Sequence, residues 1–196
     1  MRMNCDQARA ILSEYLRDNS DLSTHDSKKI TGYFECRKLK KEEFLFEQGK
    51  RFPYLVFVVQ GVLRSWVYDE QGREVVKTFV SDRQFLAEID SFKRNAPCAF
   101  SVSSVTDAEL LVLSKSNYAQ LREEVPAWHM FFMQGAMEAM NTMIRREEFL
   151  KQGEAADKYD YFLENFPHLA ATVPLKYIAS YLQINQSTLS RLRRKD

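Results

Sequence analysis

PAWHMFFMQGAMEAMNTMIRREEFLKQ, residues 126–152, is the longest stretch of this chain whose pattern predicts a single helix. Pro126 suits the first position of a helix, and no second proline interrupts the stretch. The helix would reach about 40 Å at the usual rise per residue. Its apolar residues recur at helical spacing, but they form two stripes, and a helix that packs on one core needs only one.

The two stripes make different demands on the fold. The first stripe contains Met130, Met133, Met137, Met140 and Ile144, and the second contains Phe132, Ala136, Ala139, Met143 and Leu150. One stripe can pack on the chain's own core, and the other then needs a partner. A two-fold copy of the same helix is the economical partner because such a seam is self-complementary. We therefore predict that the first stripe forms the interface of a homodimer. The alternative is a helix buried inside one large domain.

The segment before this helix reads as strands. Residues 34–114 contain short runs rich in Val, Phe and Tyr, separated by turn signals: FECRKLK, EFLFEQG, YLVFVVQG, VLRSWVY, REVVKTFV, AFSVSSV and ELLVLS. This spacing predicts about seven or eight short strands. Asp69-Glu70-Gln71-Gly72 has the composition of a hairpin turn between two of them. Packing helices are expected over residues 6–17, 25–33, 114–125 and 154–166. The fold class is therefore α+β, with an N-terminal antiparallel β-roll or jelly roll.

The segment after the long helix carries the strongest functional signal. In VPLKYIASYLQINQSTLSRLRRKD, residues 173–196, a helix that begins near Pro174 presents Ile178, Ala179 and Leu182 inward. QIN then makes a tight turn, and a second helix begins with Asn185 or Ser187 as its cap. This is a helix-turn-helix pattern. Gln183 takes the turn position where the motif often has glycine, so a left-handed backbone is expected there.

The second helix of this motif is the candidate DNA-reading element. Leu189 and Leu192 point to the core, and the candidate DNA contacts are Gln186, Ser187, Ser190, Arg191, Arg193, Arg194 and Lys195. Serine approaches base edges closely, and an arginine such as Arg191 forks onto N7 and O6 of guanine in the major groove. Arg193 and Lys195 are better placed for phosphates. The competing interpretation is a basic, solvated helix hairpin with no nucleic-acid partner.

Composition limits the alternatives. With 196 residues, of which 45% are hydrophobic and 13% aromatic, the chain is predicted to be a packed globular protein. The net charge is +1, but residues 173–196 contain five basic side chains and one acidic one, a local balance of +4. No apolar run reaches membrane-spanning length, and the first thirty residues lack the apolar centre of a signal peptide, so a cytoplasmic protein without a membrane partner is expected.

Cysteines and histidines indicate no metal or cofactor. Cys5, Cys36 and Cys98 are odd in number and far apart, which favours isolated reduced thiols over a disulfide framework or an iron–sulfur site. A buried structural role is the expectation for Cys98, with a redox switch as the alternative. An enzyme on a cupin-like jelly roll would need histidine and carboxylate ligands inside the barrel. His25, His129 and His168 all lie outside the predicted strands, so no cofactor and no enzyme activity are predicted.

The order of these parts resembles the bacterial transcription regulators typified by the cyclic-AMP receptor protein and the fumarate–nitrate reductase regulator, the CRP/FNR family. Gly49 and Gly61 are similar to that family's turn glycines, QFLAEIDSF at 84–92 resembles its effector cassette, and STLSRLRR at 187–194 resembles its recognition helix. The resemblance implies a β-roll sensor over 1–125, a dimerisation helix over 126–152 and a helix-turn-helix domain over 153–196 whose wing is reduced or absent. It also implies a palindromic double-stranded DNA partner and RNA polymerase as a further partner.

This chain departs from the family pattern in the effector cassette. The resemblance places an effector pocket at Leu86, Ala87, Glu88, Ile89, Cys98 and Ala99. Ala87 replaces a glycine, and the arginine and hydroxyl residue that hold the cyclic phosphate are replaced by Cys98 and Ala99. A buried phosphate without a paired cation is costly. The effector is therefore unknown and is not expected to be cyclic AMP. Arg94 lies four residues before Cys98 and is expected to be solvated.

The recognition helix departs as well. The family's glutamate is Ser187 here, while Arg191 is retained. Loss of the carboxylate removes an acceptor for cytosine N4, so a different half-site is expected. The leading hypothesis is a homodimeric DNA-binding regulator. The alternative is a regulatory module that binds a small molecule or a protein and does not act through DNA.

Overall fold

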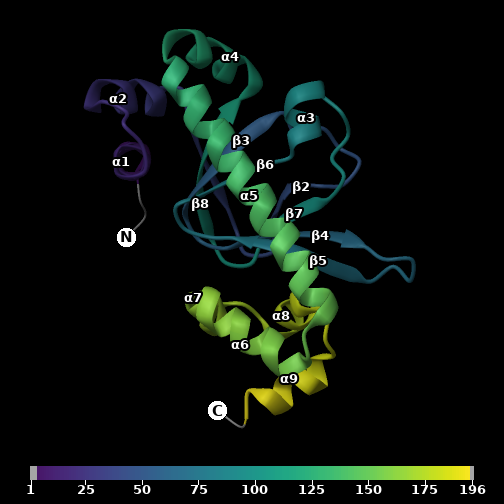
Figure 1. Cartoon of the computed structure of the whole chain (residues 1–196). Coiled ribbons are helices and arrows are strands. Elements are labelled where there is room, and N and C mark those ends of the chain that lie inside the picture. Colours follow the sequence, from purple (N-terminus) through teal and green to yellow (C-terminus); the bar gives the residue numbers. More distant parts are fainter. Residues whose placement is uncertain (1–3, 195–196) are drawn as a thin grey trace. The chain divides into compact units, whose positions relative to one another are not determined.

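The computed structural model describes residues 4–194, which form eight strands and nine helices (Figure 1). The chain divides into two compact units. The first consists of the described residues up to Ser65 together with Phe79–Gln134, and the second consists of Trp66–Thr78 together with the described residues from Gly135 onward.

Two short helices begin the chain, and polar caps fix where each starts. α1 (Cys5–Asp18) has a capping box, in which the Asn4 side chain accepts from the amide of Gln7 at 2.8 Å and the Gln7 side chain accepts from the amide of Asn4 at 2.9 Å. α2 (Thr24–Gly32) begins after Ser23, whose hydroxyl accepts from the amide of Asp26 at 3.0 Å. Both helices were predicted, each within a residue or two of these bounds.

The strands form two four-stranded sheets. They are β1 (Glu35–Leu39), β2 (Phe44–Phe46), β3 (Tyr54–Gln60), β4 (Leu63–Tyr68), β5 (Glu74–Val80), β6 (Gln84–Ala87), β7 (Ser101–Ser104) and β8 (Ala108–Ser114). One sheet has the order β1-β8-β3-β6 and the other β2-β7-β4-β5. β1 and β3 both pair with β8, β6 pairs with β3, and β2 pairs with β7, all antiparallel. The antiparallel β-roll is confirmed. β6 was not among the predicted runs.

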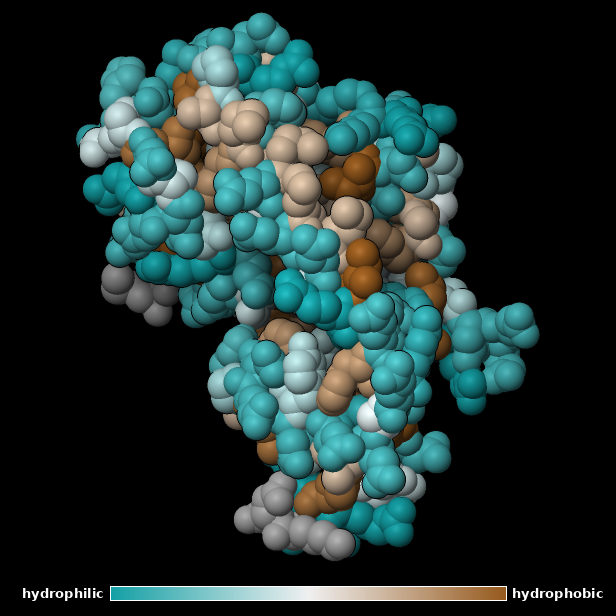
Figure 2. Space-filling view, in the orientation of Figure 1, coloured by the Kyte–Doolittle hydropathy of each residue, from teal (hydrophilic) through white to brown (hydrophobic). Residues whose placement is uncertain are grey.

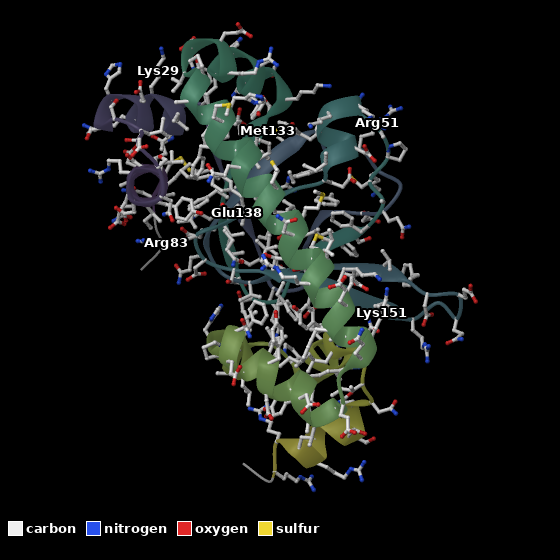
Figure 3. All side chains as sticks on the ribbon, in the orientation of Figure 1. Lys29, Arg51, Arg83, Met133, Glu138 and Lys151 are labelled. Carbon is white, nitrogen blue, oxygen red and sulfur yellow. A yellow bond between two sulfur atoms is a disulfide. The ribbon has the colours of Figure 1, made fainter. Side chains whose placement is uncertain are left out.

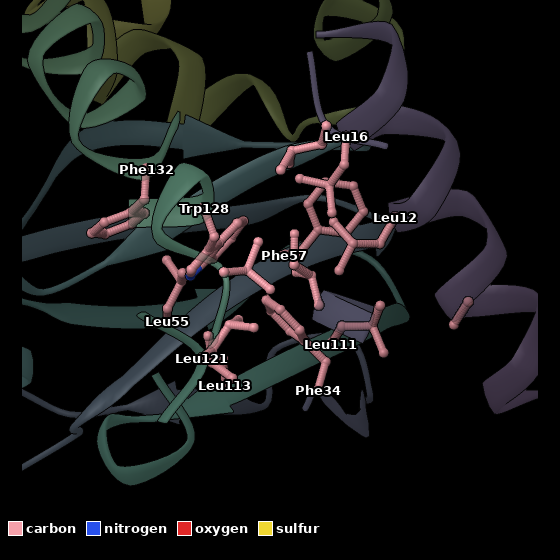
Figure 4. Packing of buried hydrophobic residues seen from close by; sticks show 14 of the residues in the cluster. Leu12, Leu16, Phe34, Leu55, Phe57, Leu111, Leu113, Leu121, Trp128 and Phe132 are labelled. Carbon is pink, nitrogen blue, oxygen red and sulfur yellow. The ribbon is translucent and has the colours of Figure 1, made fainter. Parts of the chain in front are cut away.

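The first unit has two hydrophobic cores because its central strands are buried on both faces. Along β3, Leu55 and Phe57 enter one core, and Val56 and Val58 enter the other. The same alternation continues on β8. The inter-sheet core lies between the two sheets, and the second core, which we call the helix-side core, includes buried residues of α1, α2 and the first turns of the long helix (Figure 4).

The hairpin between β4 and β5 turns where the sequence predicted. The amide of Gly72 donates to the carbonyl oxygen of Asp69 at 3.0 Å, and Gly72 has a φ of 74°. The Asp69 carboxylate accepts from the amides of Gln71 and Arg73, each at 2.9 Å. An aspartate that closes its own turn and a glycine with positive φ are what a tight hairpin requires.

α3 (Ile89–Arg94) lies between β6 and β7, and α4 (Lys115–Glu124) and α5 (Pro126–Gln152) follow β8. α3 is a short helix that the pattern did not predict, whereas α4 and α5 were predicted. α5 has the bounds expected from its first proline and its unbroken helical pattern. Trp128 near its start is fully buried in the helix-side core, as Figure 4 shows.

The second unit ends in four helices: α6 (Ala155–Asn165), α7 (Pro167–Thr172), α8 (Leu175–Leu182) and α9 (Gln186–Leu192). α6 ends before Pro167 as predicted, and Pro167 begins α7, which was not predicted. Phe162 of α6, Leu182 of α8 and Leu189 of α9 are fully buried. Burial of these side chains stabilises the small helical unit.

The prediction that all three cysteines are isolated thiols was wrong. Cys5 and Cys36 form a disulfide, with their Cα atoms 5.8 Å apart. α1 packs on β1, so two residues that are 31 positions apart in sequence become neighbours, and sequence spacing alone could not show this. Cys98 is free and buried, as expected.

Among residues 4–194, no helix combines the length and the apolar character that crossing a bilayer requires.

Candidate functional site

The helix-turn-helix predicted from residues 173–196 is formed by α8 and α9. Pro174 precedes α8, and Ile178, Ala179 and Leu182 are buried, as the periodicity predicted. Asn185 precedes α9, although its side chain makes no capping hydrogen bond. The two helices pack against each other and against α6. The motif therefore has its own small core, and the outer face of its second helix is left to solvent.

Gln183 holds the turn in a left-handed conformation, with φ 56° and ψ 41°. Two backbone bonds close this turn. The amide of Ile184 donates to the carbonyl oxygen of Ala179 at 3.1 Å, and the amide of Gln183 donates to that of Ser180 at 3.2 Å. This pair of bonds is a Schellman motif, which satisfies the last carbonyl groups of α8. Glutamine thus adopts the conformation usually given to glycine, at some cost in strain.

The exposed face of α9 carries most of the predicted DNA contacts. Gln186, Ser187, Arg191, Arg193 and Arg194 are exposed. Ser190 is half-buried, so its access to a base edge is restricted, and Lys195 lies outside the described residues.

Arg191 is partly ordered by its own helix. Its Nη2 lies 3.5 Å from the Thr188 hydroxyl, which leaves its remaining N–H groups to solvent. No ion pair with an acidic side chain is recorded for Arg191, Arg193 or Arg194 among the described residues. An arginine without an acidic partner retains its donors for an external acceptor.

Two contacts that sequence reasoning missed hold α8 in place. The Ser180 hydroxyl accepts from the amide of Val76 at 3.0 Å and donates to the carbonyl oxygen of Glu74 at 3.2 Å, so α8 sits on strand β5 of the hairpin. The buried Arg146 of α5 donates to the carbonyl oxygen of Tyr181 at 2.8 Å. The helix-turn-helix is thereby bonded both to the hairpin and to the long helix. A charged run at 145–148 gave no signal that one of its arginines is buried.

The exposed part of α5 carries a row of large apolar side chains. Among the predicted interface residues, Met130, Met137, Met140 and Ile144 are 69%, 59%, 57% and 52% exposed. Met133, labelled in Figure 3, is half-buried and packs against the helix-side core. Met143 of the second stripe is also exposed, at 55%. Figure 2 shows hydrophobic surface along the course of α5. So much exposed methionine on one helix indicates an interaction site.

The glutamate of the cassette at 84–92 makes a hydrogen bond within the protein. Glu88 is buried and is the N-cap of α3, where its carboxylate accepts from the amide of Ser91 at 2.5 Å. The Ser91 hydroxyl in turn accepts from the amide of Phe52 at 2.7 Å. These bonds tie α3 to the start of β3. One carboxylate oxygen of Glu88 is therefore already committed to the fold.

The six predicted pocket residues do not all face one cavity. Leu86 and Cys98 lie in the inter-sheet core, whereas Ala87 packs against the helix-side core. Ile89 is 41% exposed and Ala99 is also exposed, so these two residues belong to neither core. Their part in an effector pocket stays a prediction. β6 ends at Ala87 and the chain turns into a helix after Glu88, which the strand pattern did not reveal.

Arg94, the arginine that follows the cassette in sequence, does not enter the interior. Arg94 is exposed, and its Nε lies 3.6 Å from the Asp90 carboxylate, which confirms that it is solvated. Burial raises the pKa of the Cys98 thiol, and its contacts include the Ser91 hydroxyl. A thiol in such surroundings stays protonated and unreactive near neutral pH.

No group of three or more potential metal ligands occurs among residues 4–194. His25, His129 and His168 lie in α2, α5 and α7, respectively. His129 is engaged by the Tyr118 hydroxyl, which lies 2.7 Å from its Nδ1.

Part of this chain matches the model of a known family. Residues 36–125 match the model of the cyclic nucleotide-binding domain. The cAMP-activated global transcriptional regulator CRP of Salmonella typhimurium is 24% identical over 89 residues, which are 45% of this chain and 42% of that protein. The match thus spans less than half the length of the curated relative.

Solved structures share the architecture over more of the chain. FixK2 from Bradyrhizobium japonicum superposes with a TM-score of 0.72 at 15% identity, covering 83% of each chain. The catabolite activator protein of Thermus thermophilus superposes with a TM-score of 0.60 at 19% identity, covering 89% of this chain and 84% of that one. At such identities the likeness shows the fold. It confirms the fold that the resemblance implied.

Proposed function

From the premise that residues 36–125 belong to the cyclic nucleotide-binding domain family, on a chain with the fold of CRP/FNR regulators, we propose that this protein is a homodimeric, sequence-specific DNA-binding transcription regulator. The observation that carries the proposal is the helix-turn-helix of α8 and α9. Its buried face forms a core and its exposed face carries Ser187, Arg191 and Arg194.

In this proposal α9 enters the major groove of DNA. Arg191 reads a guanine by a forked pair of hydrogen bonds, because its guanidinium lies on the exposed face of the helix. Arg193 and Arg194 follow at the end of the helix and bind phosphates, which fixes the register of the helix on the duplex. Ser187 makes the close approach at the helix start. The reading residues are therefore Gln186, Ser187 and Arg191.

Dimerisation supplies the second reading helix. The exposed apolar row on α5 is the proposed seam, and a two-fold copy of the same row is its complement. Two copies of α9 would then meet half-sites about 34 Å apart, one turn of the duplex. A regulator of this kind implies RNA polymerase as its further partner. Residues 1–125, 126–152 and 153–196 would serve as sensor, dimerisation helix and DNA-binding domain.

The sensor's effector is unlike cyclic AMP in this proposal. A cyclic phosphate needs a cation and a hydroxyl at the cassette, and Cys98 and Ala99 stand at those positions. Glu88, which the resemblance places in the effector pocket, caps α3. A thermal-shift titration with cyclic AMP should leave the unfolding temperature of the protein unchanged. A rise that saturates with concentration would show that the nucleotide binds.

Selection of bound sequences from a random library of double-stranded DNA tests the main proposal. A palindrome with half-sites one helical turn apart is the expected result, since it reports regulator, dimer and half-site together. A library that shows no enrichment would instead favour the second candidate, a regulatory module that binds a small molecule or protein. The exposed methionine row on α5 also fits that candidate, because methionine-rich surfaces bind other proteins.

A further inference from the structure

The disulfide joins the first helix of the chain to the first strand. Cys5 is the first residue of α1, and Cys36 is the second residue of β1. Cys36 is exposed and Cys5 is half-buried, whereas Cys98 is 2% exposed. Small reagents in solvent therefore reach Cys36 more readily than the buried Cys98.

Cys5 and Cys36 are placed to react with each other. Cys5 lies in the first turn of a helix of 14 residues, next to strand β1. Its partner is within bonding range, with a Cα separation of 5.8 Å that suits a disulfide. One cysteine can thus attack an oxidant, and the other can resolve the product.

α1 contributes to the packing of the long helix. Leu12 and Leu16 are fully buried in the helix-side core together with Trp128 of α5, as Figure 4 shows. The ring of Tyr15 lies 5.3 Å from that of Phe57 in β3 and 6.4 Å from that of Phe131 in α5. α1 therefore forms part of the apolar surface against which the first turns of α5 pack.

Other contacts keep α1 docked when the disulfide is open. Nη2 of Arg9 donates to the carbonyl oxygen of Phe34 at 3.0 Å, and Glu14 pairs with Arg83, which Figure 3 labels, at 2.7 Å. The Glu14–Arg83 pair is about half exposed and contributes little. Reduction is thus expected to loosen α1 without unfolding the sensor.

We propose that Cys5 and Cys36 form a redox-responsive clasp that sets how firmly α1 holds the first turns of α5, and through them the affinity for DNA. The affinity part rests on the proposed function. In the compartment where DNA is read, thiols are kept reduced, so a disulfide there is a transient, signal-dependent state.

The chemistry needs a peroxide as oxidant and a dithiol as reductant. The Cys5 thiolate attacks a peroxide oxygen, the O–O bond breaks, and a sulfenic acid and hydroxide form. The Cys36 thiol then displaces the sulfenic oxygen, which leaves as water once protonated, and the S–S bond forms. The two thiols lose two electrons and two protons in all, and hydrogen peroxide becomes two waters. A dithiol reverses the bond by exchange through a mixed disulfide.

The experiment compares the full-length chain after treatment with hydrogen peroxide and after treatment with dithiothreitol. A non-reducing digest should yield a linked peptide that contains Cys5 and Cys36 only in the oxidised sample. Amide hydrogen exchange in residues 5–18 and 126–134 should then be about tenfold faster in the reduced sample, because α1 opens more often. Cys5→Ser and Cys36→Ser should exchange like the reduced protein whatever the treatment.

Cys98→Ser is the matched control, and it should keep the full difference between the two states. Absence of the linked peptide, or equal exchange in both states, would overturn the clasp. On the selected DNA site, the oxidised protein should bind at least about fivefold more tightly than the reduced one. Equal affinity would overturn the regulatory part. If neither form binds DNA, the proposed function fails, and the exchange data still decide whether the clasp exists.

Discussion

Arg146 of α5 and Tyr181 of α8 are joined twice: the guanidinium donates to the Tyr181 carbonyl oxygen at 2.8 Å, and its carbon lies 4.1 Å from the centroid of the Tyr181 ring. Arg146 is 8% exposed, and burial raises the pKa of the Tyr181 phenol, which therefore stays neutral near neutral pH. A cation that is both hydrogen-bonded and stacked is held far more firmly than a surface ion. The end of α5 and helix α8 are therefore firmly joined.

Replacing Arg146 by alanine should destabilise the helical unit. The variant loses a charged hydrogen bond and a cation–π contact, and it leaves the Tyr181 carbonyl oxygen without this donor. The expected loss is about 2 kcal/mol in the free energy of unfolding, measured by urea denaturation monitored by circular dichroism.

Arg145→Ala is the control for this variant. Arg145 directly precedes Arg146 in the same helix and is exposed. Its replacement should change the free energy of unfolding by no more than about 0.5 kcal/mol. Equal losses in the two variants would show that the contacts of Arg146 with Tyr181 contribute nothing beyond a surface charge.

Arg191 and Arg193 should differ in how they affect DNA binding. Arg191→Ala is expected to cost about 1–3 kcal/mol on the selected site and to relax the preference at one base pair, because a forked contact to a base is lost. Arg193→Ala should weaken binding to selected and random duplexes alike. Fluorescence anisotropy on both kinds of DNA separates the two effects. If both variants lose the same amount on both duplexes, Arg191 does not read a base.

A charge in the exposed apolar row should break the dimer. Met140→Asp places a carboxylate in the proposed seam, where burying it without a partner is costly, so sedimentation should shift toward monomer and binding to a palindrome should fall. Thr142→Asp introduces the same group two residues away, where the Thr142 side chain is exposed and donates to the Glu138 carbonyl oxygen. That control should remain dimeric. A Met140→Asp variant that sediments like the wild type would remove α5 as the interface.

Glu124 should make acid stability depend on pH. The Lys29 ammonium, 2.8 Å away, and the Tyr33 hydroxyl, 2.7 Å away, hold the pKa of the Glu124 carboxyl below its usual value. A carboxyl whose pKa is lower in the folded state contributes stability above its unfolded pKa and loses it as the pH falls through the folded pKa. Wild type should therefore unfold at a higher temperature than Glu124→Gln at neutral pH, and the gap should close below about pH 4.5.

Glu123→Gln is the matched control for the pH series. Glu123 pairs with its neighbour Arg122 at 3.0 Å, but its side chain is 74% exposed. Its replacement should leave the unfolding temperature nearly unchanged at every pH. If the Glu124 gap persists in acid, the carboxylate does not act through its charge.

The long helix α5 could be predicted from the sequence, whereas β6 and α3 could not. α5 has its predicted bounds because a proline begins it and no residue interrupts it. β6 has four residues and α3 has six, so neither the two-residue repeat of a strand nor the 3.6-residue repeat of a helix is visible there. In the same way, the exposed face of α9 followed from the spacing of Leu189 and Arg191, since a helix sets both directions at once.

Contacts between residues that are far apart in the sequence could not be predicted from local sequence patterns. Arg146 stands in a run of charges that reads as a solvated helix face, and its partner Tyr181 lies 35 residues on. The disulfide has the same character, because Cys5 and Cys36 meet only when α1 packs on β1. Glu88 was predicted to bind the effector. Its bond to the Ser91 amide caps α3, a helix that the sequence pattern did not predict.

Ser180 has a consequence for solubility. β5 is an outer strand of its sheet, and the hydroxyl of Ser180 occupies the amide of Val76 and the carbonyl oxygen of Glu74 on that strand. An open strand edge recruits strands from other molecules and so promotes aggregation. Helix α8 thus also covers part of this edge and hinders the addition of strands from other molecules. Any motion that lifts α8 away from the hairpin exposes an edge to which other chains can add.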